Sequence, residues 1–449
     1  MLTLRGNLLD LSQPISRRAF LTLGSLTPLG LSLPQLLSAQ SAQASEQRRD
    51  TATILLYMAG GPSHVDSYDL KTDQPAEVRG PFGRIATNLP GLDVCDLMPR
   101  HAAIADKLSV IRSITHDLSV HDDGTHWLQT GYPLLNARQR GQQHPSQGSI
   151  VSYARGANAP GMPAYVCIPE DYRRHMGFYE HAAFLSSRHN ALDAGSDPSL
   201  GNYRVPDFNP PKDVALPRVE NRRELLSQLD AFQRSISTEQ RYANLDAVQR
   251  QAFELVCGSK AREAFDLTQE PDALRDRYGR HAYGQSALLA RRLVERGVTF
   301  VTINLYEKDV DWWDDHYTIE KNLRKRLPLY DEALSTLIED IHARGLHDRV
   351  LVAAFGEFGR APRIDQHAGR GHWPKAMHAV LSGGGIKSGQ IVGSTTKNGG
   401  EPFDRALGPG DMLATIYHAM GIDHRQTITD RQNRPIPILP DGEPIRELV

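Results

Sequence analysis

The sequence has little cysteine, almost no net charge and, after its first 45 residues, no long hydrophobic run. Its three cysteines, Cys95, Cys167 and Cys257, are widely spaced and form no CxxC pair, which excludes a zinc knuckle and a full disulfide framework but leaves one disulfide possible. The 51 basic and 53 acidic residues nearly cancel, so nucleic acid is disfavoured as a partner. No later apolar run reaches the roughly 20 residues that span a bilayer, and we expect no stable membrane insertion of the mature chain.

The N-terminal segment has the pattern of an export signal. Arg17 and Arg18 stand directly before a weakly hydrophobic run that Gly and Pro interrupt, and Ala42-Gln43-Ala44 offers a small-x-small cleavage site. This pattern predicts a twin-arginine signal peptide over residues 1–44, the twin-arginine export machinery as a partner, and a periplasmic or secreted protein. The alternative is a cytosolic helix that happens to contain two arginines.

Buried-strand and helix patterns alternate through the rest of the chain. Such alternation predicts an α/β fold, a three-layer sandwich with a mostly parallel sheet between helices, over residues 50–449. A Pro-rich loop followed by amphipathic helical patterns predicts a helical insertion at about 200–280. The strand patterns lie at 51–61, 107–114, 162–168, 298–306 and 348–360, and the clearest helix patterns at 286–297 and 329–345.

Polar residues follow several of these strands, where α/β sheets bind ligands. The sequence contains 18 histidines, many of them beside Asp, Glu or Gly, which favours metal or proton chemistry. After the first strand, Gly60 and Gly61 permit a turn whose N–H groups can bind an anion, followed by Ser63 and His64. The equally weighted alternative is a turn in which Ser63 caps a short helix.

A possible metal site follows the two late strands. Asp314 and His316 form a D-x-H pair, and Glu357 follows a buried strand directly, where an isolated carboxylate is costly unless paired or metal-bound. His372 lies in GRGHWP. Arg360, like Arg370, either neutralises an anionic substrate or pairs with Glu357.

The stretch HDDGTHWLQTGYP predicts a short helix with two histidines. Asp122 or Asp123 is expected to cap it, Gly131 suits its left-handed end, and the proline that follows prevents continuation. His121 then lies at the helix N-terminus, which favours bound anions. His126 lies four residues after Asp122, which can orient it.

These motifs together resemble the DUF1501 family of exported bacterial proteins, which looks like a distant branch of the alkaline phosphatase and sulfatase superfamily. The resemblance implies an alkaline-phosphatase-like core with divalent metal at the strand ends. The segments that carry it are LLYMAGGPSHVDSYD, the Thr-Gly pair of TGYP, PSQGSIVSYARG, LLARRLVERGVTFV, WWDDH, GEFGRAPRI, GRGHWP and LSGGGIKSGQIVGST.

The resemblance also shows departures at the site. In sulfatases the nucleophile precedes a Thr-Gly pair by nine positions, which here is His121. The superfamily's late Asp-His pair becomes Glu357-Phe358, so Glu357 can stand in for Asp while Phe358 cannot replace a metal-binding His. One of two metal sites therefore looks degraded. The surviving set is Asp314, His316, Glu357 and His372, with Asp331 matching a recurrent Asp of the following helix.

Two functions remain open on these observations. The first is an exported metal-dependent hydrolase of phosphate or sulfate esters, acting on a small-molecule or saccharide ester. His121 is then a nucleophile or a metal ligand, and His64, His116 or His126 is the general acid. The second is a non-catalytic metal-containing binding protein, for a ligand such as sulfated polysaccharide. In both, the divalent ion is zinc by preference, with calcium, magnesium or manganese as alternatives.

Overall fold

The computed structural model describes residues 50–134, 141–169, 179–203, 205, 259–306 and 312–449. The predicted signal peptide, most of the predicted insertion and Cys257 lie outside these residues. Cys95 and Cys167 are buried thiols, so no disulfide joins these two. In the described part of the chain, no helix is both long and apolar enough to cross a membrane.

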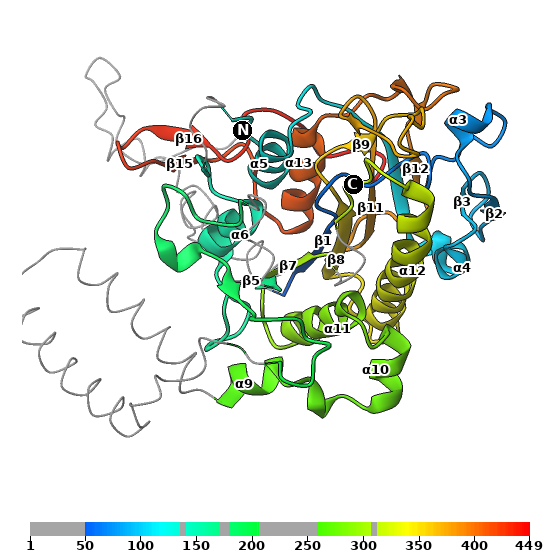
Figure 1. The fold of residues 1–449 in the computed structure, drawn as a ribbon. Helices are drawn as coiled ribbons and strands as arrows, with labels where there is room; N and C mark the ends of the chain where they lie inside the picture. The colour runs from blue at the N-terminus through cyan, green and yellow to red at the C-terminus, as the bar shows by residue number, and fades with distance from the viewer. Residues whose placement is uncertain (1–49, 135–140, 170–178, 204, 206–258, 307–311) are drawn as a thin grey trace, which may run out of the picture. The chain divides into compact units, whose positions relative to one another are not determined.

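An eight-stranded sheet forms the centre, in the order β12-β4-β11-β8-β1-β7-β5-β6 (Figure 1). Strand β1 pairs in parallel with both β7 and β8, and β11 runs antiparallel between β4 and β8. The other described pairings in this sheet are parallel. The strands are β1 Ala52–Tyr57, β4 Ser109–Ile114, β5 Tyr165–Ile168, β6 Leu192–Asp193, β7 Phe300–Asn304, β8 Val350–Phe355, β11 Met377–Gly383 and β12 Ile391–Val392.

Helices cover both faces of the sheet, which explains why the central strands are apolar without alternation. Ile54 and Leu56 of β1 pack into one core with residues of α11 and α12, whereas Leu55 and Tyr57 pack into a second core with residues of α6 and α13. Figure 1 shows these two helical layers on opposite sides of the strands. The predicted three-layer α/β sandwich is confirmed.

The remaining elements are short or peripheral to the sheet. The described α-helices are α3 Ala76–Arg79, α4 Pro99–Ile104, α5 His121–Thr130, α6 Gln147–Arg155, α9 Ser259–Phe265, α10 Asp272–Tyr278, α11 Ala282–Glu295, α12 Ile319–Ala343 and α13 Pro409–Ala419. Two-stranded sheets join β2 Arg84–Ala86 with β3 Asp93–Cys95, β9 Gly359–Arg360 with β10 His372–Trp373, β13 Ser394–Thr395 with β14 Pro402–Asp404, and β15 Thr427–Thr429 with β16 Pro435–Pro437.

Three local predictions were wrong. Helix α12 begins at Ile319 and runs through Pro328, because the buried residues of its first half pack into the core and outweigh the hydrogen bond that proline removes. Val120, which offers no side-chain hydrogen bond, precedes α5, so Asp122 and Asp123 lie in the first turn rather than at the cap. Residues that follow Ser63 form turns, and Ser63 donates to Asp66 instead of capping a helix. The left-handed Gly131 at the end of α5 is as predicted.

Candidate metal centre

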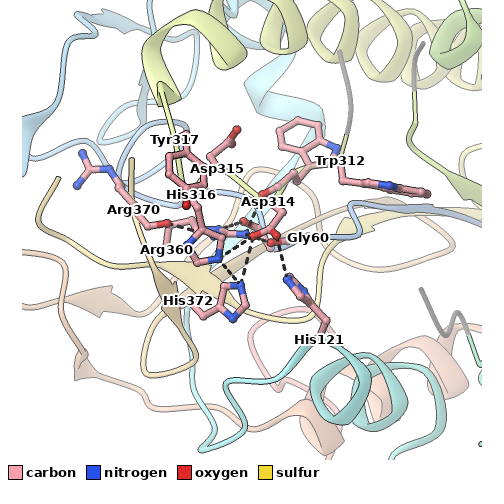
Figure 2. Close-up of polar contacts among 12 residues, drawn as sticks. Gly60, His121, Trp312, Asp314, Asp315, His316, Tyr317, Arg360, Arg370 and His372 are labelled. Carbon is pink, nitrogen blue, oxygen red and sulfur yellow. Dashed lines mark hydrogen bonds and ion pairs between the residues drawn. The ribbon is translucent and has the colours of Figure 1, made fainter. Parts of the chain in front are cut away.

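Polar side chains from four segments meet beyond the carboxyl ends of the parallel strands. His121 is the first residue of α5, which follows β4, and Asp314 and His316 lie in the segment between β7 and α12. Glu357 comes directly after β8, and His372 lies in β10. Figure 2 shows His121 and His372 directed toward Asp314 from different parts of the fold.

Three of these side chains have ligand atoms close enough to share one ion. The ligand atoms of His121, Asp314 and His372 lie within 4.8 Å of one another. Asp314 Oδ1 is 3.2 Å from His372 Nε2, and Asp314 Oδ2 is 3.3 Å from His121 Nε2. His316 Nε2 lies beside them, 3.2 Å from Asp314 Oδ1 and 2.8 Å from His372 Nε2. We call these four residues the His–Asp cluster.

The hydrogen bonds of two histidines direct their free nitrogens into the cluster. His372 Nδ1 donates to the carbonyl of Ser119 at 2.7 Å, and His121 Nδ1 donates to Glu357 Oε1 at 2.6 Å. Since these Nδ1 atoms carry the protons, a neutral ring has its lone pair on Nε2, which faces Asp314. Within the described residues, the buried His121 Nε2 makes no hydrogen bond. Histidines that bind metals usually have their other N–H engaged in this way.

Glu357 supports His121 from beneath the cluster. Its side chain is fully buried, and Oε1 also accepts the N–H of Gly60 at 2.8 Å. His116 Nε2 donates to the carbonyl of Glu357 at 2.7 Å. The predicted anion-binding turn thus binds the protein's own carboxylate. Gly60 has a φ of 111°, and a Cβ there would lie 2.5 Å from the backbone nitrogen of Asp314, so the turn requires glycine.

The two arginines near the cluster form ion pairs with aspartates. Arg360 is fully buried, pairs with Asp314 and donates to the carbonyls of Gly61 and Trp313, whereas Arg370 forms a two-pronged pair with Asp66. Among the described residues neither arginine pairs with Glu357, so that one of the two alternatives is excluded. Arg360 fixes the carboxylate that faces the histidines.

Opposing effects set the charge states of Asp314 and His121. Burial would raise the pKa of the Asp314 carboxyl, but close contacts with the His121 and His372 rings and the charge of Arg360 hold this pKa far below its usual range. Burial would lower the pKa of His121, but Asp314 and Glu357 raise it to about 9. The centre therefore holds a fixed negative charge against which a proton or a metal ion can bind.

Three other candidate residues are held by groups outside the His–Asp cluster. His126 donates through Nδ1 to the carbonyl of Tyr132 and accepts the N–H of Gln143 at Nε2, so both ring nitrogens are engaged. His64 Nε2 contacts the carbonyl of Gly399 at 2.8 Å. Asp331 accepts hydrogen bonds from the backbone N–H groups of Arg100 and His101 and from the His101 ring, at the start of α4.

The donor set fits a divalent transition metal. Ligands about 2.0–2.1 Å from a tetrahedral zinc ion lie about 3.3 Å from one another. The two carboxylate oxygens of Asp314 each lie at a similar separation from one imidazole, Oδ1 at 3.2 Å from His372 Nε2 and Oδ2 at 3.3 Å from His121 Nε2. Two imidazoles suit zinc better than calcium or magnesium, which prefer oxygen ligands. The Asp314 side chain is 36% exposed and that of His372 is 21% exposed, so one side of the cluster is open to solvent.

Several supporting groups escaped the sequence analysis. The Ser119 carbonyl holds His372, and the Tyr57 hydroxyl lies 3.4 Å from Glu357 Oε2. A backbone carbonyl carries no side-chain signal, and Tyr57 reads as an ordinary residue of an apolar strand. The Gly60-Gly61 pair did signal an anion site, although the anion proved to be distant in sequence.

Solved structures with a similar fold show low sequence identity. They include a sulfatase from Pseudoalteromonas sp. (TM-score 0.38, 10% identity, covering 86% of this chain and 70% of that one) and a phosphonate monoester hydrolase from Silicibacter pomeroyi (0.35, 9%, 88% and 76%). A further match is the C-terminal periplasmic domain of EcEptC from Escherichia coli, in complex with Zn (0.36, 11%, 89% and 92%). Likeness at this level carries no inference about activity.

Sequence comparison gives the family more directly. No curated protein matches the chain significantly. The profile of the family described as "Protein of unknown function (DUF1501)" matches residues 50–449, which include the whole described fold and the His–Asp cluster. The chain therefore belongs to the DUF1501 family.

Proposed function

We propose that this protein is a metal-dependent hydrolase of phosphate or sulfate esters whose ion is bound by His121, Asp314 and His372. The observation that carries the proposal is the convergence of two Nε2 atoms on one carboxylate, each from a ring whose Nδ1–H is already engaged. Such an ion would polarise the ester and activate water.

The other residues of the predicted ligand set receive supporting roles. Glu357 keeps the His121 ring oriented and its Nε2 available, acting through His121 rather than facing the cluster. His316, 38% exposed, lies on the solvent side and is placed to contact the ester. His121 serves as a ligand in this proposal. Its alternative role as nucleophile predicts a covalent phosphoryl or sulfuryl adduct, which mass spectrometry of the quenched reaction would detect.

Metal analysis combined with a panel of chromogenic phosphate and sulfate esters tests the proposal. We expect about one zinc ion per chain and turnover of at least one ester class, both lost in His372→Ala. His367→Ala is the matched control, since His367 is an exposed histidine that contacts Tyr317 rather than the cluster. Absence of stoichiometric metal, or equal turnover by His372→Ala, would overturn the proposal.

One observation favours a second function, a metal-containing binding protein without catalysis. Arg360 and Arg370 are both engaged by carboxylates, so neither offers an uncompensated charge to an anionic ester. Under this function the protein binds the ion and retains a ligand such as sulfated polysaccharide but turns over no ester of the panel.

We further propose export through the twin-arginine machinery to a periplasmic or secreted location. The pattern around Arg17 and Arg18 supports this step. Cell fractionation of the full chain beside an Arg17→Lys, Arg18→Lys variant tests it. Export is expected for the natural chain and loss of export for the variant, and equal export of both would refute the assignment.

A further inference from the structure

A pocket lies near the C-terminal end of α5, away from the His–Asp cluster at its N-terminus. Its volume is 370 Å³, and its walls come from three segments: residues 142–144, residues 183–184 and the β15–β16 hairpin with its turn. Helix α5 spans ten residues, or about 15 Å. Because His121 begins this helix and Tyr132 follows its end, the pocket and the His–Asp cluster lie near opposite ends of one rigid element.

The walls of the pocket are tied to one another. The His144 ring stacks on Tyr132, with centroids 3.7 Å apart, and the Tyr132 hydroxyl donates to the carbonyl of Pro437 in the hairpin. Arg431 reaches from the hairpin to the carbonyl of Ala183 at 2.9 Å. The N–H of Gln143 donates to His126 of α5. These contacts join the wall segments of the pocket to one another and to α5.

Two polar atoms in the pocket wall lack partners. Gln143 Nε2 and His144 Nδ1 are buried, and neither makes a hydrogen bond within the described residues. Both atoms are covered by protein. A rotation of each side chain toward the pocket would let Gln143 Nε2 donate to a ligand oxygen and His144 Nδ1 accept from a ligand hydroxyl.

The pocket also combines an aromatic wall with positive charge. The Phe184 ring lies edge-on to His144, with centroids 5.9 Å apart, and provides an apolar surface. Arg434 is neutralised by Asp430, whose carboxylate also accepts two backbone N–H groups of the turn. Arg431 pairs with no carboxylate in the described part of the chain, which leaves one positive charge at the pocket.

We propose that this pocket binds an acidic saccharide unit. Phe184 packs against the face of the sugar ring, Gln143 and His144 hydrogen-bond its hydroxyl groups, and Arg431 binds its acidic group. This unit would be part of a longer ester whose reacting end lies at the His–Asp cluster, and that second step rests on the proposed function. Binding by the pocket itself does not.

Titration with a uronate-containing disaccharide, its neutral counterpart and inorganic sulfate tests the proposal by calorimetry and saturation-transfer NMR. We expect the acidic disaccharide to bind, the neutral one to bind at least about tenfold more weakly, and sulfate alone not to bind. Equal binding of the two disaccharides, binding of sulfate alone, or no binding of the acidic disaccharide would overturn the proposal.

Variants separate the pocket from the metal centre. Phe184→Ala and Arg431→Gln should each weaken binding at least about tenfold, while Arg446→Gln, an exposed arginine paired with Glu447, should leave it unchanged. Unaltered binding in both pocket variants would refute the site. Asp314→Ala should retain disaccharide binding while losing hydrolysis. Disaccharide binding by a natural chain that hydrolyses no ester would count against the proposed function alone. Hydrolysis without disaccharide binding would count against the pocket alone.

Discussion

Two aspartate–arginine pairs near the carboxyl ends of the parallel strands differ in what surrounds them. Asp66 and Arg370 are both fully buried and hold each other by two hydrogen bonds. Asp314 pairs with the equally buried Arg360, but its own side chain is 36% exposed and faces three histidines. In the first pair the two charges neutralise each other inside the protein and stabilise loops. In the second pair the Asp314 carboxylate stays available for a ligand. The same two residue types therefore serve structure or chemistry according to access and neighbours.

The largest expected effect comes from the accessible pair. Asp314→Asn should lower metal affinity and ester turnover by more than about 100-fold, because it removes the charged member of the ligand set. Arg360 also loses its countercharge, but Asp314 is 36% exposed, so solvent screens the loss and stability should fall less than in the fully buried Asp66–Arg370 pair. Metal titration, turnover and thermal melting of one preparation measure the three quantities. A variant that binds metal normally would contradict the assignment.

The buried pair should show the reverse pattern. Asp66→Asn leaves the Arg370 guanidinium buried without a countercharge, and we expect a loss of about 3–5 kcal/mol in the free energy of unfolding. Folded molecules should still bind metal. Asp276→Asn, which breaks an exposed pair with Arg280, is the control and should lower the free energy of unfolding far less. Chemical denaturation gives these values. Equal losses of unfolding free energy in Asp66→Asn and Asp276→Asn would show that burial does not set the Asp66–Arg370 pair apart from an exposed pair.

Glu357→Gln tests whether Glu357 acts by orienting the His121 ring. The amide keeps the size of the side chain but loses the charge that orients and polarises His121, so metal affinity should fall about 10–100-fold. Competition with a chelator measures the change, and Glu401→Gln, at an exposed position, is the control. An effect as large as that of Asp314→Asn would instead indicate that Glu357 binds the ion directly.

The smallest effect concerns His126, which we assign to structure. Burial lowers its pKa to about 4, below the value of about 6.5 in an unfolded chain. The unfolded state therefore binds more protons as pH falls from about 6.5 toward 4, and stability declines over that range. In His126→Gln the fall in melting temperature between pH 7 and pH 5 should be smaller by about 1–2 °C. An unchanged difference would contradict this origin of the pH dependence.

The sequence predicted the layers of the fold better than its details. Strands β1, β7 and β8 stood out because both of their faces are buried and their residues are apolar throughout. The antiparallel β11 was missed, although it is equally buried. Its apolar run is short, and such a run does not indicate whether a strand is parallel or antiparallel. Helix α12 was cut short at Pro328, where packing of the earlier turns overrides the local preference.

At the site, the sequence predicted which residues are present more readily than which of them contact one another. Asp314, His316 and His372 do meet, and their position after late strands was the signal. The sequence alone did not indicate that Glu357 contacts His121 and Gly60 or that Arg360 pairs with Asp314. The residues in these contacts lie 46 to 297 positions apart in the chain. Only the folded arrangement separates a metal ligand from the carboxylate that orients it.

The central claim is that His121, Asp314 and His372 bind one divalent ion. The most direct test is a crystal structure of zinc-loaded protein with anomalous diffraction measured at the zinc edge. We expect one anomalous peak about 2.0–2.2 Å from His121 Nε2, His372 Nε2 and an Asp314 carboxylate oxygen. A structure of the loaded protein with no peak at these three atoms, or with the zinc held elsewhere, would contradict it.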